Sequence, residues 1–383
     1  MKTPAQKRLQ QRRLWLKLHL YLGLTLGLIL AILGLTGTVI GFWEEIYEWT
    51  EPALVVPKSE QGYASLDKVL ATIKATHPGR HKSWQLNMPR TEQSVLYALY
   101  TGPEEKGDAY AATLILAMDP NSGRIISTWY WGETWLSWFY NIHFMLDADR
   151  FGEKVVGISG LLAVFSALTG LYLWWPLGRF SKSTFVFNFR GGPARLEFDL
   201  HRLIGFYTLL LFLIVSVSGF MLTFPKQSAE VIRVVSPVEF PIKTFMSNTK
   251  NGPGISAMQA VTIAEQVFPG GELKRVYSPA GSDGVWQLAF SHDANTYDTP
   301  YRYSRVWIDQ YSGQVLHSVD PTQFSAGEDL FSFRLLLHNG EVFGLPGRLF
   351  ISVYGLFVVM LYITGVMQWW RRRKISQLQQ AVS

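Results

Sequence analysis

Residues 143–176 read HFMLDADRFGEKVVGISGLLAVFSALTGLYLWWP, and residues 338–370 read HNGEVFGLPGRLFISVYGLFVVMLYITGVMQWW. Each stretch begins with a histidine, reaches a Thr-Gly pair 26 residues later and a Trp-Trp pair 31 residues later. The apolar part of each is long enough to cross a hydrocarbon core of about 30 Å as a helix that rises about 1.5 Å per residue. The sequence therefore predicts a histidine-bearing membrane segment that occurs twice.

A second histidine-bearing segment is duplicated as well. His19 lies 17 residues before Thr36-Gly37, and His201 lies 17 residues before Ser218-Gly219. Each half of the chain thus follows the same order of histidine, apolar helix, polar domain, histidine and apolar helix. These four histidines at matched positions are the most informative feature of the sequence.

The composition indicates a membrane protein. Of 383 residues, 48% are hydrophobic and 17% are charged. The apolar residues concentrate in four segments that we predict to be membrane helices, at 14–43, 154–175, 203–224 and 347–370. We interpret the first as a retained helix rather than a signal peptide, because its apolar part is long and no A-x-A site follows it. The chain has no cysteine, which excludes iron–sulfur clusters, covalent c-type haem and disulfides.

Lysine and arginine predict the orientation of the helices. The segments 1–17, 176–200 and 371–383 hold fourteen of these cations and only two acidic residues. Because cytoplasmic segments next to membrane helices collect Lys and Arg, we expect both termini to be cytoplasmic. The net charge of +6 then reflects topology and does not indicate a nucleic-acid partner.

The two polar stretches between the helices look alike. Each contains a helical pattern that ends at Pro-Gly, an alternating strand and an Asp-x-x-Ser-Gly turn. These features stand at 66–79, 95–99 and 119–123 in the first stretch, and at 255–270, 285–288 and 309–313 in the second. We predict that each stretch folds as a small α+β module outside the cytoplasm.

These observations predict a membrane α-helical four-helix bundle with an internal duplication, both ends inside, and two extracytoplasmic α+β modules. In chain order we expect helix 1 (14–43), module 1 (44–142), a histidine-bearing boundary segment with helix 2 (143–176), a cytoplasmic loop (177–200), helix 3 (201–224), module 2 (225–337), a histidine-bearing boundary segment with helix 4 (338–370) and a basic cytoplasmic tail (371–383).

A parallel duplication in a membrane implies an approximate two-fold axis along the membrane normal. We therefore expect His19 to face His201 near the cytoplasmic surface, and His143 to face His338 near the external surface. Neutral imidazole binds metals and haem iron, and a haem with two histidine ligands has no free coordination site, which suits electron transfer. The bundle glycines could clear space for such a group or simply allow close helix packing.

Simpler interpretations exist for single residues. A lone histidine at a helix end is more often an interfacial side chain bonded to water or a carbonyl, but four at matched register favour a cofactor. We predict that the histidines without duplicated counterparts are solvated surface residues: His77, His81, His292 and His317. An interfacial belt explains most of the tryptophans before His143, with the wall of a substrate site as the alternative: Trp129, Trp131, Trp135 and Trp138. Basic residues near the inner histidines either pair with haem propionates or anchor the helices: Arg12, Arg13, Lys17 and Arg202.

The chain resembles the PepSY-associated transmembrane family of iron-regulated inner-membrane proteins, and most closely its ferric-siderophore reductases. The likeness spans nearly the whole chain. It rests on the helix starts at Leu18-His19 and Leu200-His201, the turns at 119–123 and 309–313, and the run 168–176 echoed at 363–365.

This resemblance implies a multi-pass protein of a bacterial inner membrane with two external PepSY-like modules. It also implies two b-type haems with His19, His201, His143 and His338 as axial ligands, and an oxidoreductase that acts on a ferric siderophore. Adding one electron to Fe(III) held by hard oxygen ligands makes a softer, more weakly held Fe(II). No flavin or nicotinamide motif is present, so the donor would be a membrane quinol or an unidentified protein.

Two other functions fit the same sequence. In one, the modules bind a peptide or a partner protein without catalysis and the helices anchor them. In the other, the bundle is a siderophore permease. Transporters usually have broken helices and buried polar groups near the midplane, whereas here the midplanes are apolar and the ionisable residues lie at the helix ends. This distribution favours electron transfer.

Overall fold

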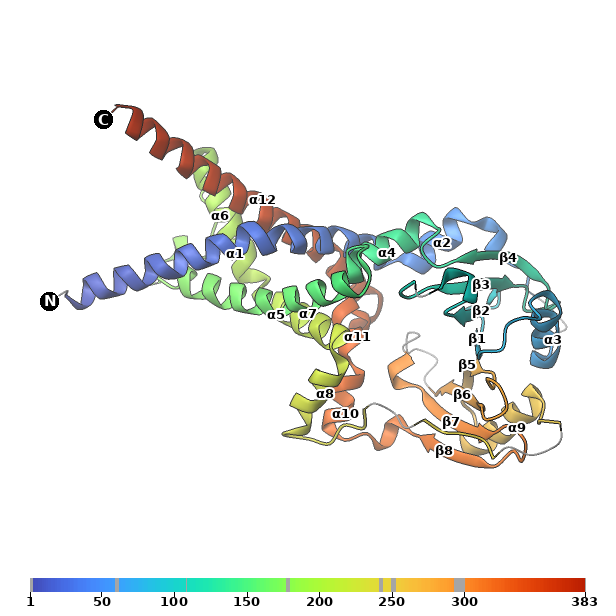
Figure 1. Ribbon diagram of the computed structural model, residues 1–383. Helices are drawn as coiled ribbons and strands as arrows, with labels where there is room; N and C mark the ends of the chain where they lie inside the picture. Colours follow the sequence, from blue (N-terminus) through green and yellow to red (C-terminus); the bar gives the residue numbers. More distant parts are fainter. Residues whose placement is uncertain are drawn as a thin grey trace. The chain divides into compact units, whose positions relative to one another are not determined.

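The computed structural model describes residues 3–58, 62–107, 109–176, 180–240, 244–248, 253–292 and 300–382. Residues 177–179 of the expected cytoplasmic loop therefore lie outside the described part. The chain forms two compact units (Figure 1). A helical unit comprises 1–42, 139–228 and 334–383, and a sheet unit comprises 43–138 and 229–333.

The helical unit contains long apolar helices and the short helices that connect them. Its helices are α1 (Pro4–Ile40), most of α4 (Trp135–Met145), α5 (Asp149–Trp174), α6 (Gly192–Tyr207), α7 (Leu209–Thr223), the start of α8 (Pro225–Arg233), α11 (Arg334–Asn339) and α12 (Gly344–Val382). Within the described residues, three helical segments are long and apolar enough to cross a membrane: Gln6–Ile40, Asp149–Trp174 and Glu341–Gln380.

The third predicted span is not one straight helix. Helices α6 and α7 together are long and apolar enough to cross a membrane, but they meet at an angle of 62°. At this angle, the Thr208 hydroxyl donates to the Ile204 carbonyl at 2.7 Å. The prediction of one continuous helix over 203–224 is therefore wrong at Thr208. The matching position in the first half, Leu26, lies inside the unbroken α1.

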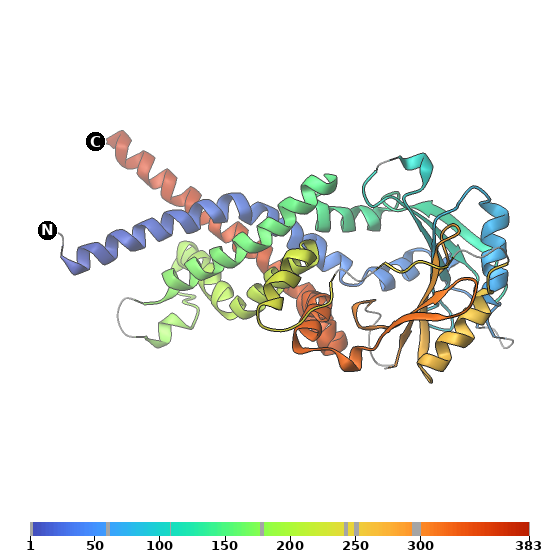
Figure 2. The same cartoon turned by 60° about the horizontal axis from the view of Figure 1, so that its bottom comes forward.

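Helices α1 and α12 cross at a contact between two glycines (Figure 2). A Cβ on Gly355 would lie 2.3 Å from the Gly34 carbonyl oxygen, and one on Gly34 would lie 2.6 Å from that of Gly355. Beside this contact, the Thr38 hydroxyl donates to the Ser352 carbonyl at 2.8 Å. Small residues let the two backbones touch, which is the usual way membrane helices pack closely.

The start of α1 and the end of α12 lie at the same end of the helical unit (Figures 1 and 2). An even number of crossings would give this arrangement, so it agrees with four spans when α6 and α7 are counted as one.

The sheet unit is built on one antiparallel sheet of eight strands in the order β4-β3-β2-β1-β5-β6-β7-β8. Its strands are β1 (Trp84–Asn87), β2 (Leu96–Thr101), β3 (Thr113–Met118), β4 (Ile125–Tyr130), β5 (Glu272–Tyr277), β6 (Val285–Ser291), β7 (Ser304–Asp309) and β8 (Val315–Val319). Its helices are α2 (Trp43–Thr50), α3 (Leu66–Thr76), α9 (Ala257–Val267) and α10 (Ala326–Ser332), with short 3₁₀ turns at 52–54, 104–106, 300–302 and 321–323.

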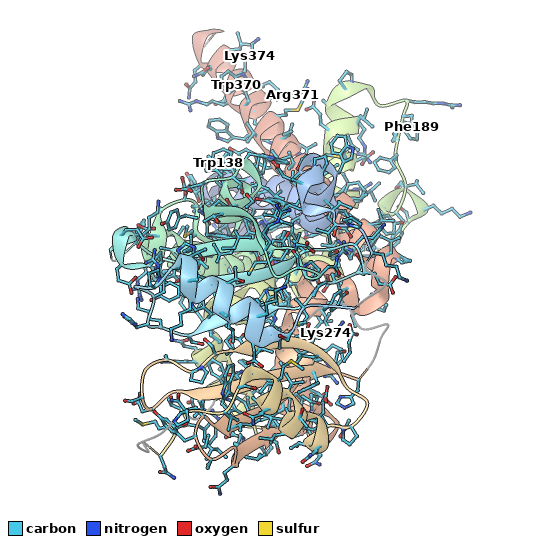
Figure 3. All side chains as sticks on the ribbon, turned by 90° about the vertical axis from the view of Figure 1, so that its right-hand side faces the viewer. Trp138, Phe189, Lys274, Trp370, Arg371 and Lys374 are labelled. Carbon is cyan, nitrogen blue, oxygen red and sulfur yellow. The ribbon has the colours of Figure 1, made fainter. Side chains whose placement is uncertain are left out.

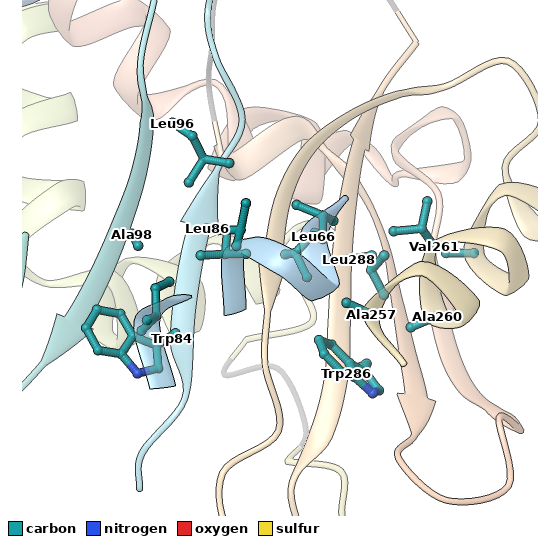
Figure 4. Close-up of a cluster of buried hydrophobic side chains, with 14 of the residues drawn as sticks. Leu66, Trp84, Leu86, Leu96, Ala98, Ala257, Ala260, Val261, Trp286 and Leu288 are labelled. Atoms are coloured by element: carbon teal, nitrogen blue, oxygen red, sulfur yellow. The ribbon is translucent and has the colours of Figure 1, made fainter. Parts of the chain in front are cut away.

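The two predicted modules share this sheet. Each contributes four strands, and β1 pairs with β5 at the centre, with Gln85 opposite Tyr277. We expected two separate modules, and the sequence did not predict that β1 and β5 would pair. A hydrophobic core to which both modules contribute lies between the sheet and helices α3 and α9 (Figure 4). Leu86, Val276 and Leu288 from the central strands are fully buried there, and burying each such side chain stabilises a fold by roughly 1.5–3 kcal/mol.

Helices α3 and α9 begin and end alike. Ser65 and Ser256 cap their N-termini, and residues His77 and Phe268 follow their last turns, where the sequence predicts each helix to end. One carboxylate also joins the modules, because Asp67 of α3 accepts a hydrogen bond of 2.7 Å from the backbone N–H of Ala257 at the start of α9.

Both predicted Asp-x-x-Ser-Gly turns are present, and the second holds a buried carboxylate. Gly123 and Gly313 each have φ of +72°, which favours glycine. Asp309 is 1% exposed and accepts backbone N–H groups of Asn248, Tyr311 and Ser312 at 2.8–2.9 Å. Burial raises the pKa of Asp309, but these hydrogen bonds outweigh burial and lower the pKa to about 2.

We predict that this carboxylate makes the sheet unit acid-sensitive. The folded pKa is below the unfolded value of about 3.9, so the stabilisation is complete above about pH 4 and disappears as the pH falls to about 2. Asp309→Asn should cost about 2 kcal/mol at neutral pH and flatten the acid limb of a thermal unfolding series on the full chain. Asp119→Asn, in the half-buried equivalent turn, is the matched control and should cost less. Equal acid limbs for wild type and Asp309→Asn would contradict the assignment.

Candidate functional site

The four duplicated histidines all lie in the helical unit, on four different helices. His19 is in α1, His143 in α4, His201 in α6 and His338 in α11. The segments around His143 and His338, predicted as boundary segments, are short helices that precede the membrane helices α5 and α12.

The structure brings these histidines together in two pairs. The ring centroids of His19 and His201 are 6.2 Å apart, with planes at 80°. Those of His143 and His338 are 6.1 Å apart, with planes at 63°. Each pair takes one histidine from each half of the duplication, as the two-fold arrangement predicts.

Every one of these rings is held in the same way against a neighbouring helix. In the His143/His338 pair, His143 Nδ1 lies 2.9 Å from the Leu33 carbonyl oxygen and 3.1 Å from Thr36 Oγ1. His338 Nδ1 lies 3.0 Å from the Val215 carbonyl oxygen and 3.2 Å from Ser218 Oγ.

The His19/His201 pair repeats this geometry. His19 Nδ1 lies 3.2 Å from the Ser166 carbonyl oxygen and 3.0 Å from Thr169 Oγ1. His201 Nδ1 lies 3.0 Å from the Leu361 carbonyl oxygen and 3.1 Å from Thr364 Oγ1. All four sites thus use a carbonyl and, three residues later, a hydroxyl.

These contacts fix the tautomer of each ring. A carbonyl oxygen can only accept, so Nδ1 must carry the proton and donate it. The hydroxyl protons are already used, since Thr36, Ser218 and Thr364 each donate to the carbonyl four residues earlier at 2.7–2.8 Å. Nε2 of each ring therefore holds a lone pair. Within the described part of the chain none of the four Nε2 atoms has a hydrogen-bond partner.

The docking partners are exchanged within each half. His19 of α1 docks on α5, and His143, just before α5, docks on α1. In the same way His201 docks on α12 and His338 docks on α7. The constant spacing between a histidine and the Thr-Gly or Ser-Gly pair in its own segment does not reflect a direct contact. Instead, the equal spacings in the two halves keep the exchanged contacts at matching positions along the helices.

A glycine follows each of the four hydroxyl residues and lies directly under a histidine ring. A Cβ on Gly37 would be 2.9 Å from His143 Cε1, and one on Gly219 would be 3.0 Å from His338 Cε1. The corresponding distances are 3.1 Å for Gly170 under His19 and 3.4 Å for Gly365 under His201. These glycines therefore make room for the imidazoles rather than for a macrocycle.

The turns after His143 and His338 are also duplicated. A Cβ on Gly152 would lie 1.7 Å from the Met145 carbonyl oxygen, and one on Gly347 would lie 2.1 Å from that of Gly340. Only glycine permits this close approach, which returns the chain into α5 and α12 immediately after each histidine.

The other histidines of the chain lie in the sheet unit. His81 is exposed, as predicted. His292 is exposed as well, although its ring contacts Phe268. His77 and His317 are only partly exposed: His77 contacts Trp84, and His317 stacks on Phe245 with centroids 4.9 Å apart.

Trp129 and Arg12, two of the aromatic and basic candidates, have protein partners of their own. Trp129 packs on Tyr47 and Tyr97 in the sheet unit. Arg12 donates to the carbonyls of Leu173 and Trp175, where a cation compensates the C-terminal end of α5.

Arg202 is held on α6 itself. It donates to Asp199 at 2.9 Å and to the Ser183 carbonyl at 3.0 Å, so it joins α6 to the loop before it. Asp199 is fully buried by these contacts and was not singled out from the sequence.

No group of three or more His, Asp or Glu side chains in the described segments is arranged to hold a metal ion. Each histidine pair can therefore offer a metal ion at most two imidazole nitrogens. Two imidazoles that coordinate one metal from opposite sides, with bonds of about 2.0 Å, have ring centroids about 6 Å apart. The observed separations fit a group that supplies the other ligands itself, as the four ring nitrogens of a haem do.

Comparison of the chain with known protein families agrees with this architecture. No curated protein matches the chain. A family model described as the PepSY-associated TM region matches residues 16–372, which include both histidine pairs and the whole sheet. The chain is therefore a member of the PepSY-associated transmembrane family.

Proposed function

We propose that this chain is a di-haem b oxidoreductase of a bacterial inner membrane that passes electrons across the bilayer to Fe(III) held by a siderophore, releasing Fe(II) at the external face. The proposal rests on the two sets of facing histidines, in which no Nε2 atom has a hydrogen-bond partner among the described residues. A haem iron ligated by both histidines of a pair exchanges single electrons without an open coordination site.

The protein residues supply position and tautomer. His19 and His201 would hold one haem, and His143 and His338 the other. In each ring the Nδ1–H bond to a carbonyl keeps Nε2 deprotonated and directs it, as partner groups of metal-bound histidines commonly do. The two pairs lie near opposite ends of the apolar helices, which supports a relay across the membrane. The Lys and Arg distribution supports cytoplasmic termini, with His143 and His338 on the external side.

Reaction and substrate class can be tested together. Chemically reduced protein should release Fe(II) from at least one member of a panel of hydroxamate and catechol ferric siderophores, one Fe(II) per electron, as measured with a coloured Fe(II) chelator. His143→Ala should be reduced yet lose most of this activity. If reduced wild-type protein releases no Fe(II) from any member of the panel, the proposed reaction is wrong.

The glycines beneath the histidines provide a graded prediction. Gly37→Ala would place a Cβ 2.9 Å from His143 Cε1 and must displace that ring, so we expect about tenfold or greater loss of haem affinity at that site. Gly365→Ala places its Cβ 3.4 Å from His201 Cε1, an ordinary contact, and should change affinity by no more than about twofold. Haem titration of both purified variants measures this difference. Similar affinities in the two variants would show that the glycines do not set ring position.

The bend between α6 and α7 favours one competing function. Broken spans are common in transporters, so the bent third span supports a siderophore permease more than the sequence alone does. Uptake of a ferric siderophore labelled in both iron and ligand distinguishes the two functions in proteoliposomes. The oxidoreductase should transfer no ligand to the lumen, whereas equal transfer of iron and ligand would favour the permease.

A further inference from the structure

The segment that precedes α6 is ordered by one buried carboxylate. Asp199 of α6 is fully buried. It accepts the backbone N–H of Asn188 at 3.0 Å, and it pairs with Arg195 at 3.0 Å and Arg202 at 2.9 Å. Arg202 also donates to the Ser183 carbonyl at 3.0 Å. The backbone of this segment is therefore held on α6.

One side of the segment packs on the helices. The ring of Phe185 contacts Trp174 of α5 and Phe206 of α6, with centroids 5.6 and 5.8 Å away. The Tyr207 hydroxyl donates to the Phe185 carbonyl at 2.9 Å. These contacts explain an aromatic residue at this position and leave its apolar neighbours unexplained.

The other side presents large apolar side chains to the surroundings. Phe189 is 80% exposed and Val186 is 53% exposed. The ring of Phe187 stacks on that of Phe189, with centroids 5.8 Å apart and planes at 30°. Figure 3 shows Phe189 well apart from Trp370 and Arg371 of α12. Exposed apolar groups on a segment whose backbone is fixed indicate a contact with an apolar partner.

Cations stand beside these apolar groups. Lys182 and Arg190 are exposed, and within the described ranges neither side chain forms an ion pair. The acids of the stretch 175–224, Glu197 and Asp199, are both buried and paired with arginines. We refer to Lys182, Val186, Phe189 and Arg190 as the loop surface. A partner that complements it must offer apolar and anionic groups together.

The position of the loop surface in the chain identifies that partner. The segment joins α5 to the bent pair of helices α6 and α7, which are both membrane segments. It therefore lies at a membrane surface, whichever side of the membrane that is. An apolar ring at the acyl boundary, with Lys or Arg at the level of the lipid phosphates, is how interfacial segments bind a bilayer. Clustered cations make such binding selective for anionic lipids.

We propose that the loop surface docks on anionic phospholipid headgroups of the membrane in which the chain is embedded. Phe189 and Val186 enter the acyl boundary, and Lys182 and Arg190 contact lipid phosphates. Because Asp199 ties the segment to α6, docking also holds the start of the helix that carries His201 at the membrane surface. This inference does not depend on the proposed function and stands whether or not the chain binds haem.

The absence of cysteine from the chain allows a direct test on the purified full chain. A nitroxide attached at Phe189→Cys reports its accessibility to oxygen, which dissolves in the bilayer, and to a nickel complex, which stays in water. The vesicles contain phosphatidylcholine alone or mixed with phosphatidylglycerol. The ratio of oxygen to nickel accessibility should be at least about threefold higher in the mixed vesicles. Adding Lys182→Gln and Arg190→Gln should remove this difference.

The matched control adds Lys74→Gln and Arg124→Gln, which remove two exposed cations of the sheet unit, to the same labelled chain. It should keep the threefold difference. A label that the nickel complex reaches freely in both kinds of vesicle would overturn the proposal. A label shielded from both reagents would overturn it too, since protein and not lipid would then cover the loop surface. Equal burial of the label in both kinds of vesicle, unchanged by loss of Lys182 and Arg190, would equally contradict docking on anionic headgroups.

Discussion

Replacing His143 by alanine is expected to leave one haem per chain instead of two and to lower ferric-siderophore reduction at least about a hundredfold. The reason is that, in the proposed function, each haem takes one ligand from each half of the chain. Without His143, the opposing His338 stays docked on the Val215 carbonyl but has no partner across the site. Reduced-minus-oxidised absorbance and haem extraction measure the content per chain. His81→Ala, an exposed histidine of the sheet unit, is the control and should keep both haems.

Double variants test the pairing itself. His143→Ala combined with His338→Ala should lose the same single haem as either change alone, because both residues serve one site. His143→Ala combined with His201→Ala should lose both haems. If single variants at all four positions kept two haems per chain, the ligand assignment would be wrong.

Replacing Gly355 by valine should have the largest effect on stability. Its Cβ would lie 2.3 Å from the Gly34 carbonyl oxygen and 2.4 Å from Thr38 Oγ1, and the backbone of α1 cannot move without separating the helices. Overpacking of this kind costs about 1–3 kcal/mol or more. The expected result is a lower unfolding temperature and poor recovery in detergent.

The matched control is Gly23→Val, also at a membrane-helix glycine, where a Cβ would meet nothing within 4 Å. It should change the unfolding temperature little. Equal losses at both positions would mean that valine in these helices, and not the contact between α1 and α12, determines stability.

The sequence predicted the features that depend on local pattern. Apolar length and periodicity placed the membrane helices, and the Asp-x-x-Ser-Gly pattern placed the turns at 119–123 and 309–313. The duplication also predicted which histidines meet, because a parallel repeat determines which residues face each other across its axis.

Features that depend on distant backbone groups were not predicted. The strand β1 pairs with β5, about 190 residues away, and nothing in the alternation of either strand distinguishes a paired edge from a free one. The bend at Thr208 has no proline to mark it.

The sequence also did not predict that His19 docks on α5 and His143 docks on α1. Each histidine stands at a constant spacing from a Thr-Gly pair in its own segment, and that spacing does not show which pair the histidine contacts.

The central claim is that each histidine pair holds one haem with two axial imidazoles. Low-temperature electron paramagnetic resonance of the purified oxidised protein, together with haem extraction, tests it most directly. The proposed function predicts two low-spin ferric haems per chain, one of which disappears in His143→Ala and the other in His19→Ala. A colourless protein, or high-spin haem with an open coordination site, would contradict it.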